Sequence, residues 1–202
     1  MKRGGLIAII VIALLLLAGG GCVVGNYNRL VATDQNVKNR WAEVDNQLQR
    51  RNDLIGNLVE SVKGIASQEQ AVFGEIANAR AALGGAHTPA QGIEAGRAMD
   101  TALSRLLVVV ENYPQLKSNE QFSQLMDELA GTENRLSVAR MRYNDEAKGY
   151  NTLVKQFPTN LYATAFNFKE APYYPVSEAA KTAPKVDFSG IKPGAAPTPA
   201  GK

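Results

Sequence analysis

Apolar side chains recur every seven residues along two long stretches of this chain. The second stretch carries an unbroken series: Phe122, Leu129, Leu136, Tyr143, Tyr150 and Phe157. The first stretch, residues 27–65, carries two interleaved series in which Asp34 and Arg51 are the charged exceptions. Because residues three and four apart share one face of an α-helix, this spacing predicts two long amphipathic helices with coiled-coil-like packing.

Two shorter helices are expected between the long ones. Apolar residues at helical spacing predict one helix over about 67–83 and another over about 91–113, separated by the loop GGAHTPAQG. Pro158 ends the last helix, and no period-two alternation indicates a strand. The predicted fold class is all-α, an antiparallel up-and-down bundle of four helices, two long and two short.

The stretch YPQLKSN connects the third and fourth predicted helices. Pro114 cannot continue the third helix, and Ser118 with Gln121 has the spacing of a capping box for the fourth. Ser67 with Gln70 predicts the same device at the start of the second helix. The stretch is therefore interpreted as a corner between helices.

Three residues of this corner, Asn112, Tyr113 and Asn119, have two interpretations. They form a partner-contact tip at the far end of the bundle, or they serve only as helix caps and turn-formers. The residue types alone do not separate these interpretations, because asparagine is favoured both at caps and in turns.

The lengths of the helices predict their register. The two long helices are each about 39 residues, or about 58 Å, so in antiparallel packing the numbers of facing residues add to about 184. Arg51 then lies level with Glu133, and we predict an ion pair that fixes the register, because a lone buried charge costs more than a pair. The alternative is that Arg51 extends its charged end into water.

The short helices leave half of each long helix without a partner. Two helices alone cannot bury both apolar stripes, so something must cover the end of the bundle nearest residue 27. We expect the segment NLYATAFNFKEAPYY to fold back over it, with a second chain as the alternative.

Residues 6–25 contain no charged side chain, and Lys2 and Arg3 precede them. About 20 apolar residues suffice to cross a bilayer as a helix, so we predict a single-pass transmembrane anchor with the N-terminus inside and the bundle outside the cytoplasm. Two alternatives remain open: a cleaved signal peptide, and a lipoprotein modified at Cys22.

Composition excludes several classes of function. Residues 26–170 hold 16 basic and 17 acidic side chains, so they offer no net positive charge for nucleic acid. One cysteine and one histidine permit neither an internal disulfide nor a Cys/His zinc site. A nucleophile with an imidazole base would depend on His87, which lies in the flexible-looking loop. No metal or cofactor is expected.

The chain divides into four parts on these grounds. Residues 1–5 form a short basic N-terminus, 6–25 the predicted membrane segment, 26–170 the bundle, and 171–202 a tail rich in Pro and Ala that is expected to be partly disordered.

Several ordered blocks of the sequence resemble the LemA family. They are YNRLV, VKNRWAEVDNQLQRRNDLIGNLVESVKGIA, VVENYPQLKSNEQFSQLMDELAGTENRLSVARMRYNDEAKGYN, QFPTNLYA and APKVDF. The resemblance spans residues 27 to about 188. It implies a membrane-anchored helical bundle and implies no catalytic residues.

Three functions follow as hypotheses. The first is a non-enzymatic interaction or scaffold module at the cell envelope, whose partners are the membrane and either a membrane protein or a second copy. The second is an enzyme that uses the carboxylates Asp127, Glu128 and Glu133, which is disfavoured because adjacent helical residues diverge. The third is a binder of lipid or another hydrophobic ligand between the two long helices, in their half nearest the membrane.

Overall fold

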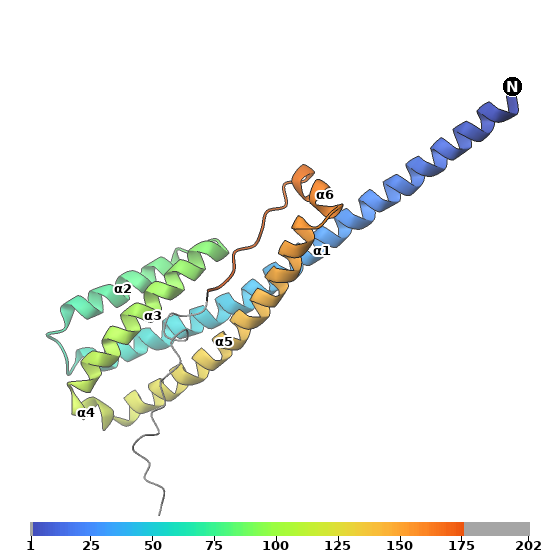
Figure 1. The fold of residues 1–202 in the computed structure, drawn as a ribbon. Helices are drawn as coiled ribbons and strands as arrows, with labels where there is room; N and C mark the ends of the chain where they lie inside the picture. The colour runs from blue at the N-terminus through green and yellow to red at the C-terminus, as the bar shows by residue number, and fades with distance from the viewer. Residues whose placement is uncertain (1, 176–202) are drawn as a thin grey trace, which may run out of the picture.

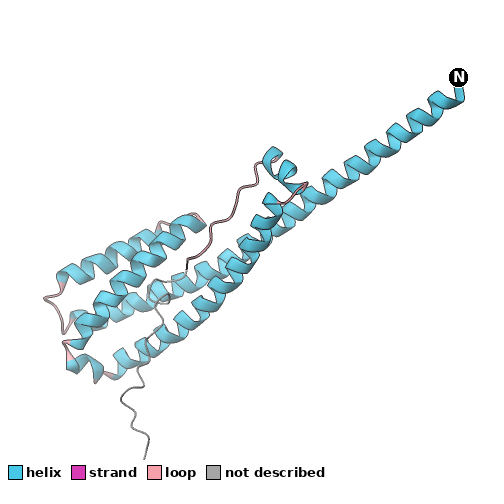
Figure 2. Ribbon diagram, in the orientation of Figure 1, coloured by secondary structure: helices cyan, strands magenta, loops and turns pink. Residues whose placement is uncertain are grey.

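The computed structural model describes residues 2–175, and each regular element in that range is a helix. Six helices follow one another (Figure 1): α1 (Lys2–Lys63), α2 (Gln70–Gly84), α3 (Pro89–Glu111), α4 (Pro114–Lys117), α5 (Glu120–Lys155) and α6 (Thr159–Ala165). Figure 2 shows helices joined by short loops and one longer extended segment after α6. The prediction of an all-α fold is confirmed, and the predicted corner contains the one-turn helix α4.

Helices α1 and α5 run antiparallel and make the largest contact between elements of the fold (Figure 1). Trp41 packs on Tyr143 with ring centroids 5.4 Å apart. Ten residues further along α1, Arg51 Nη2 lies 3.4 Å from Glu133 Oε2. Both pairs of residue numbers add to 184, so the predicted register is confirmed.

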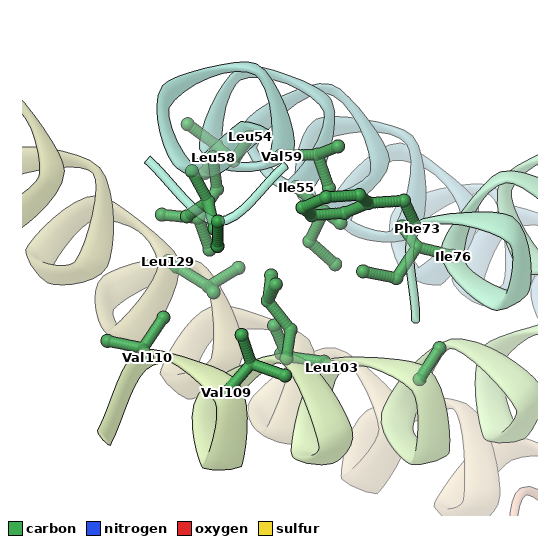
Figure 3. Packing of buried hydrophobic residues seen from close by; sticks show 14 of the residues in the cluster. Leu54, Ile55, Leu58, Val59, Phe73, Ile76, Leu103, Val109, Val110 and Leu129 are labelled. Carbon is green, nitrogen blue, oxygen red and sulfur yellow. The ribbon is translucent and has the colours of Figure 1, made fainter. Parts of the chain in front are cut away.

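The α2–α3 hairpin covers the half of the α1–α5 pair that lies next to α4 (Figure 1). In Figure 3, side chains from α1, α2, α3 and α5 converge on one apolar cluster. Its most deeply buried members include Ile55, Leu58, Ile76, Met99 and Leu106. Burial of a large aliphatic side chain contributes about 1.5–3 kcal/mol, so this cluster is a main source of stability.

The other half of the α1–α5 pair is covered by the chain that follows α5. Helix α6 packs against both long helices, and Leu30, Leu153 and Ala163 form a small buried cluster there. Residues 167–175, which we name the strap, continue along α5 toward the α2–α3 hairpin (Figure 1). In the strap, Tyr174 is a buried member of the core cluster of this half, and Phe168 and Ala171 pack against that cluster. The expected fold-back is therefore confirmed.

Two helix starts differ from the prediction. Ser67 lies ahead of α2, which begins at Gln70 without a side-chain cap. Asn119, rather than Ser118, caps α5, and its Oδ1 accepts a hydrogen bond from Phe122 N at 3.0 Å. Ser118 ends α4 and is not available to start the next helix. Both capping-box predictions are wrong.

A capping box does occur at a third helix start. Thr88 Oγ1 accepts from Gln91 N at 3.3 Å, and Gln91 Oε1 accepts from Thr88 N at 3.1 Å at the start of α3. This reciprocal pair satisfies backbone donors that the first turn leaves free. Pro89 at the first position fits the same start, since its missing N–H would have no partner within the helix.

The part of α1 ahead of residue 26 projects away from the bundle (Figure 1). Several of its aliphatic side chains are exposed, including Ile7, Val11, Leu14 and Leu17. Across the range that the structure describes, no helix combines the length and the hydropathy needed to cross a membrane. The prediction of a single-pass transmembrane segment over residues 6–25 is therefore wrong.

Two other sequence-based predictions fall outside what the structure describes. Cys22 belongs to α1, but its side chain is not among the described ones, so lipid attachment stays a prediction. Residues 176–202, most of the predicted tail, are likewise outside the described range.

Candidate functional site

Two asparagines of α5 hold the strap by its backbone. Asn151 Nδ2 donates to Ala171 O at 2.9 Å, and its Oδ1 accepts from Ala171 N at 2.8 Å. Asn144 pairs in the same way with Tyr174, with both hydrogen bonds at 2.8 Å. Seven residues of helix advance about 10.5 Å and three extended residues about 10 Å, so the two spacings match. The side-chain amides thus serve the strap as a neighbouring β-strand would.

Side chains add specificity to this backbone pairing. Tyr143 Oη donates to Pro172 O at 2.7 Å, and Lys155 Nζ pairs with Glu170 Oε2 at 2.8 Å on the surface. Tyr174 is only 3 % exposed and its ring lies under the Arg140 guanidinium, 4.4 Å from the ring centroid. The surface formed by Tyr143, Asn144, Asn151 and the site that buries the Tyr174 side chain is named the strap groove.

The Tyr174 side chain is buried in contact with the backbone of α3, which requires a residue without a side chain at that point. A Cβ atom added at Gly96 would lie 2.6 Å from Tyr174 Oη, closer than two such atoms can approach. Gly92, one turn earlier, leaves space for the Trp41 indole in the same manner. Only glycine at these positions allows α3 to lie this near to aromatic side chains of α1 and the strap.

Beside Tyr174 lies a cluster of four charged side chains. Arg51, whose side chain is 6 % exposed, donates to Asp100 Oδ1 from α1 to α3 and pairs with Glu133 Oε2 at 3.4 Å. Arg140 Nη1 donates to Glu133 Oε1 at 3.3 Å, and its Nη2 lies 4.0 Å from Asp100 Oδ2. Two positive and two negative charges balance, which reduces the cost of removing Arg51 from water.

The structure brings Arg51 and Glu133 together as the register argument expected, but it adds Asp100 as the partner with the shorter contact. Sequence reasoning missed Asp100. Its signal was its place on the predicted third helix, next to Met99 and three residues before Leu103, at the edge of the apolar seam. A carboxylate there is well placed to meet a cation from the facing helix.

Several buried polar atoms of this cluster lack hydrogen-bond partners. They are Arg51 Nε, Arg140 Nε and Nη2, Glu133 Oε2 and Tyr174 Oη. A buried polar atom without a partner typically costs about 1–3 kcal/mol. The buried polar atoms without partners in this part of the fold therefore lie together beneath the C-terminal end of the strap.

The three corner residues each have a structural contact. Asn119 caps α5, and Asn112 ends α3 with its side chain 3.4 Å from Val108 O. Tyr113 Oη donates to Glu69 at 3.4 Å and the ring packs on the core. These contacts account for the residue types, while a role of the corner in partner binding stays a prediction.

The carboxylates considered for catalysis do not share one environment. Asp127 and Glu128 are exposed, whereas Glu133 is engaged by Arg51 and Arg140. Within residues 2–175 no group of three or more His, Cys, Asp or Glu side chains is arranged to hold a metal ion. His87 is exposed, and its backbone N–H donates to Gln91 Oε1 at 3.0 Å.

A groove between α1 and α5 lies open on the surface. Its cavity volume is about 540 Å³. It is lined from α1 by Glu43, Asn46 and Gln47, and from α5 by Asn134, Arg135, Val138, Ala139 and Arg142. Val138, one of its lining residues, is 44 % exposed and lies midway along α5. We name this feature the α1–α5 groove.

Burial shifts the titration of three tyrosines in the half that the strap covers. It raises the pKa of Tyr143 to about 12 and that of Tyr150 to about 12, where Asp34 adds to the effect. It also raises the pKa of Tyr174, although Arg140 partly offsets this. The phenolate form is disfavoured in each case because the folded chain removes it from water.

Replacing Arg51 by methionine tests the charge cluster. Arg51→Met keeps the apolar stem but leaves Asp100, Glu133 and Arg140 unbalanced, so we expect the free energy of unfolding to fall by about 2–3 kcal/mol, less than for a fully buried pair. Chemical denaturation measures the change. The control is Arg50→Met at an exposed neighbouring position, which we expect to be nearly neutral.

Alkaline pH tests the buried tyrosines. The unfolded chain loses tyrosine protons near pH 10, before the folded chain does, so stability present below about pH 10 is lost between about pH 10 and pH 12. Tyr143→Phe removes one titrating group, and its free energy of unfolding should fall less steeply over this range. An unchanged slope in the variant would contradict the assignment.

Known proteins resemble this chain over most of its length. The sequence profile of the LemA family matches residues 40–188. Magnetosome protein MamQ 2 of Paramagnetospirillum magneticum is 29% identical over 182 residues, covering 77% of this chain and 67% of the relative. MamQ of Magnetospirillum gryphiswaldense is 26% identical with the same coverage. Protein LemA of Metamycoplasma hominis is 22% identical, covering 84% of this chain and 77% of the relative. The chain belongs to the LemA family.

Proposed function

We propose that the chain is a non-enzymatic interaction module whose α1–α5 groove binds an acidic amphipathic helix of a partner protein. The open groove itself is the observation that carries the proposal. It runs between two long helices that are fixed in register, and it exposes Val138 between Arg135 and Arg142. A helix laid into such a groove buries its apolar face there.

Charge selects the kind of helix that fits. Arg135, Val138 and Arg142 are spaced three and four residues apart, so they form one stripe along α5. On α1 the groove carries one charge, Glu43, which already pairs with Arg40 at 2.7 Å. Within residues 2–175, Arg135 and Arg142 of the α5 wall form no ion pair, although Arg135 Nη2 donates to Thr132 Oγ1 at 3.2 Å, so the α5 wall carries the positive charge of the groove. A partner helix with acidic residues beside its apolar stripe complements it.

Binding of a hydrophobic ligand between α1 and α5 is less well supported. The half of the pair proposed for it is occupied by the chain itself, through Ala163 of α6 and Phe168, Ala171 and Tyr174 of the strap. A ligand would have to displace these side chains, and with them the backbone pairs to Asn144 and Asn151.

The proposal includes a location at a membrane surface. Membership of the LemA family supports it, as do the exposed aliphatic side chains on the projecting part of α1. A contiguous apolar surface of this kind marks a site that another apolar surface covers. Fractionation of cells that produce the full chain measures this location, and recovery away from the membranes would contradict it.

Site-specific photo-cross-linking in intact cells tests the groove. A photoreactive residue at position 138 should give a cross-linked product whose partner peptide maps to an acidic amphipathic helix. Val108 is the matched control, because it is an aliphatic residue of α3 that is 61 % exposed but lies outside the groove.

Charge reversal then checks the mode of binding. The double variant Arg135→Glu with Arg142→Glu should reduce the yield of the cross-linked product at position 138 at least tenfold. The control Arg97→Glu, at an exposed position of α3, should leave that yield unchanged. Equal products at positions 138 and 108, or a partner segment without acidic residues, would refute the groove as the binding site.

A further inference from the structure

We infer that the strap groove also accepts the strap of a second copy of the chain, so that two copies exchange residues 167–175. The second copy then contributes Ala171 and Tyr174 to the first copy's site. This inference does not depend on the partner helix proposed for the α1–α5 groove.

The strap groove can bind the strap of another chain because most of its contacts are with backbone atoms. The side chains of Asn144 and Asn151 hydrogen-bond to backbone N–H and C=O groups of the strap, and Tyr143 donates to one backbone carbonyl. Tyr174 supplies one buried anchor, and Glu170 supplies one charge for Lys155. These are the features of a peptide-binding site that takes an extended segment, in which backbone pairing gives affinity and single side chains give specificity.

The segment that fits this groove is carried by every copy of the chain. Its pattern is Glu-Ala-Pro-x-Tyr, residues 170–174. Exchange between copies regenerates each hydrogen bond and the Lys155–Glu170 ion pair without requiring a new contact. Such a swap is a route to a dimer that costs little in contacts.

We place the hinge for exchange at the end of α6, where Asn167 N donates to Thr164 O at 3.3 Å and Phe168 N donates to Ala163 O at 2.9 Å. The strap leaves α6 at Asn167, whose φ of 57° is the sole positive value among non-glycine residues of the described chain. Ahead of the hinge, α6 stays attached to its own α1, since Thr159 Oγ1 lies 3.3 Å from Asn26 Oδ1 and Ala163 is buried. The eight strap residues beyond Asn167 can span up to about 28 Å when extended.

The strap's own end weakens its hold on the groove. Arg51 Nε and Arg140 Nε are buried there without a hydrogen-bond partner, whereas Glu133 Oε2 keeps its ion pair with Arg51. Undocking therefore returns several polar atoms to water, which offsets part of the apolar surface that is lost. The strap in its own chain still competes strongly because tethering gives it a high effective concentration, so exchange is favoured where copies are concentrated.

Mixing two single-cysteine chains tests the exchange directly. One chain carries Lys155→Cys and the other Glu170→Cys, both with Cys22→Ser. This exposed ion pair can be replaced without disturbing the core. Under mild oxidation, exchange predicts a covalent dimer of the mixed chains. Its yield should be at least fivefold above that of the matched control, in which Arg142→Cys, at an exposed α5 position on another face of the helix, replaces Lys155→Cys.

A third substitution separates exchange from random collision. Adding Asn151→Ala to the Lys155→Cys chain removes one backbone pair and should lower the yield of mixed dimer to the control level, with helical content by circular dichroism confirming that the chain is folded. A mixed dimer no more abundant than the Arg142→Cys control, or one that Asn151→Ala leaves unchanged, would overturn the inference.

Discussion

The antiparallel pairing of α1 and α5 with one buried arginine in its seam constrains the rest of the fold. Arg51 replaces an apolar residue in a seven-residue series, so its charge must be neutralised where it lies. Asp100 on α3 and Glu133 on α5 provide the opposite charges. A slip of one helical turn would separate these groups, so the ion pairs fix the register of the long helices and the position of α3.

The unequal lengths of the helices explain the strap. Helices α2 and α3 have 15 and 23 residues, against 36 for α5, so they cover only one half of the long pair. Ala147, Tyr150 and Leu153 in the other half would otherwise face water. The chain after α5 covers them with a short helix and an extended segment, and two asparagines satisfy backbone groups that an extended segment leaves free. The same device creates a groove that recognises a peptide.

Much of this arrangement follows from the sequence. The seven-residue spacing predicts the two long helices, their lengths predict the register that Trp41 and Tyr143 display, and the missing cover predicts the fold-back. Asp100 was missed because helical spacing gives a residue's face but not the rotation of α3 against α1. The asparagine pairs were missed because Asn144 and Asn151 read as ordinary polar positions until an extended backbone lies beside them. The length, the lack of charge and the apolar centre of residues 6–25 predict a transmembrane span, but no helix within residues 2–175 combines the length and hydropathy that a span needs.

Hydrogen–deuterium exchange of the full chain, comparing the natural sequence with the double variant Asn144→Ala and Asn151→Ala, tests most directly whether the strap completes the core. We expect faster exchange confined to the half that the strap covers, residues 30–44 of α1 and 143–153 of α5, with exchange in the cluster around Ile55 and Leu106 unchanged. Equal protection of both halves in the variant would contradict this role of the strap, because the core would then be complete without it.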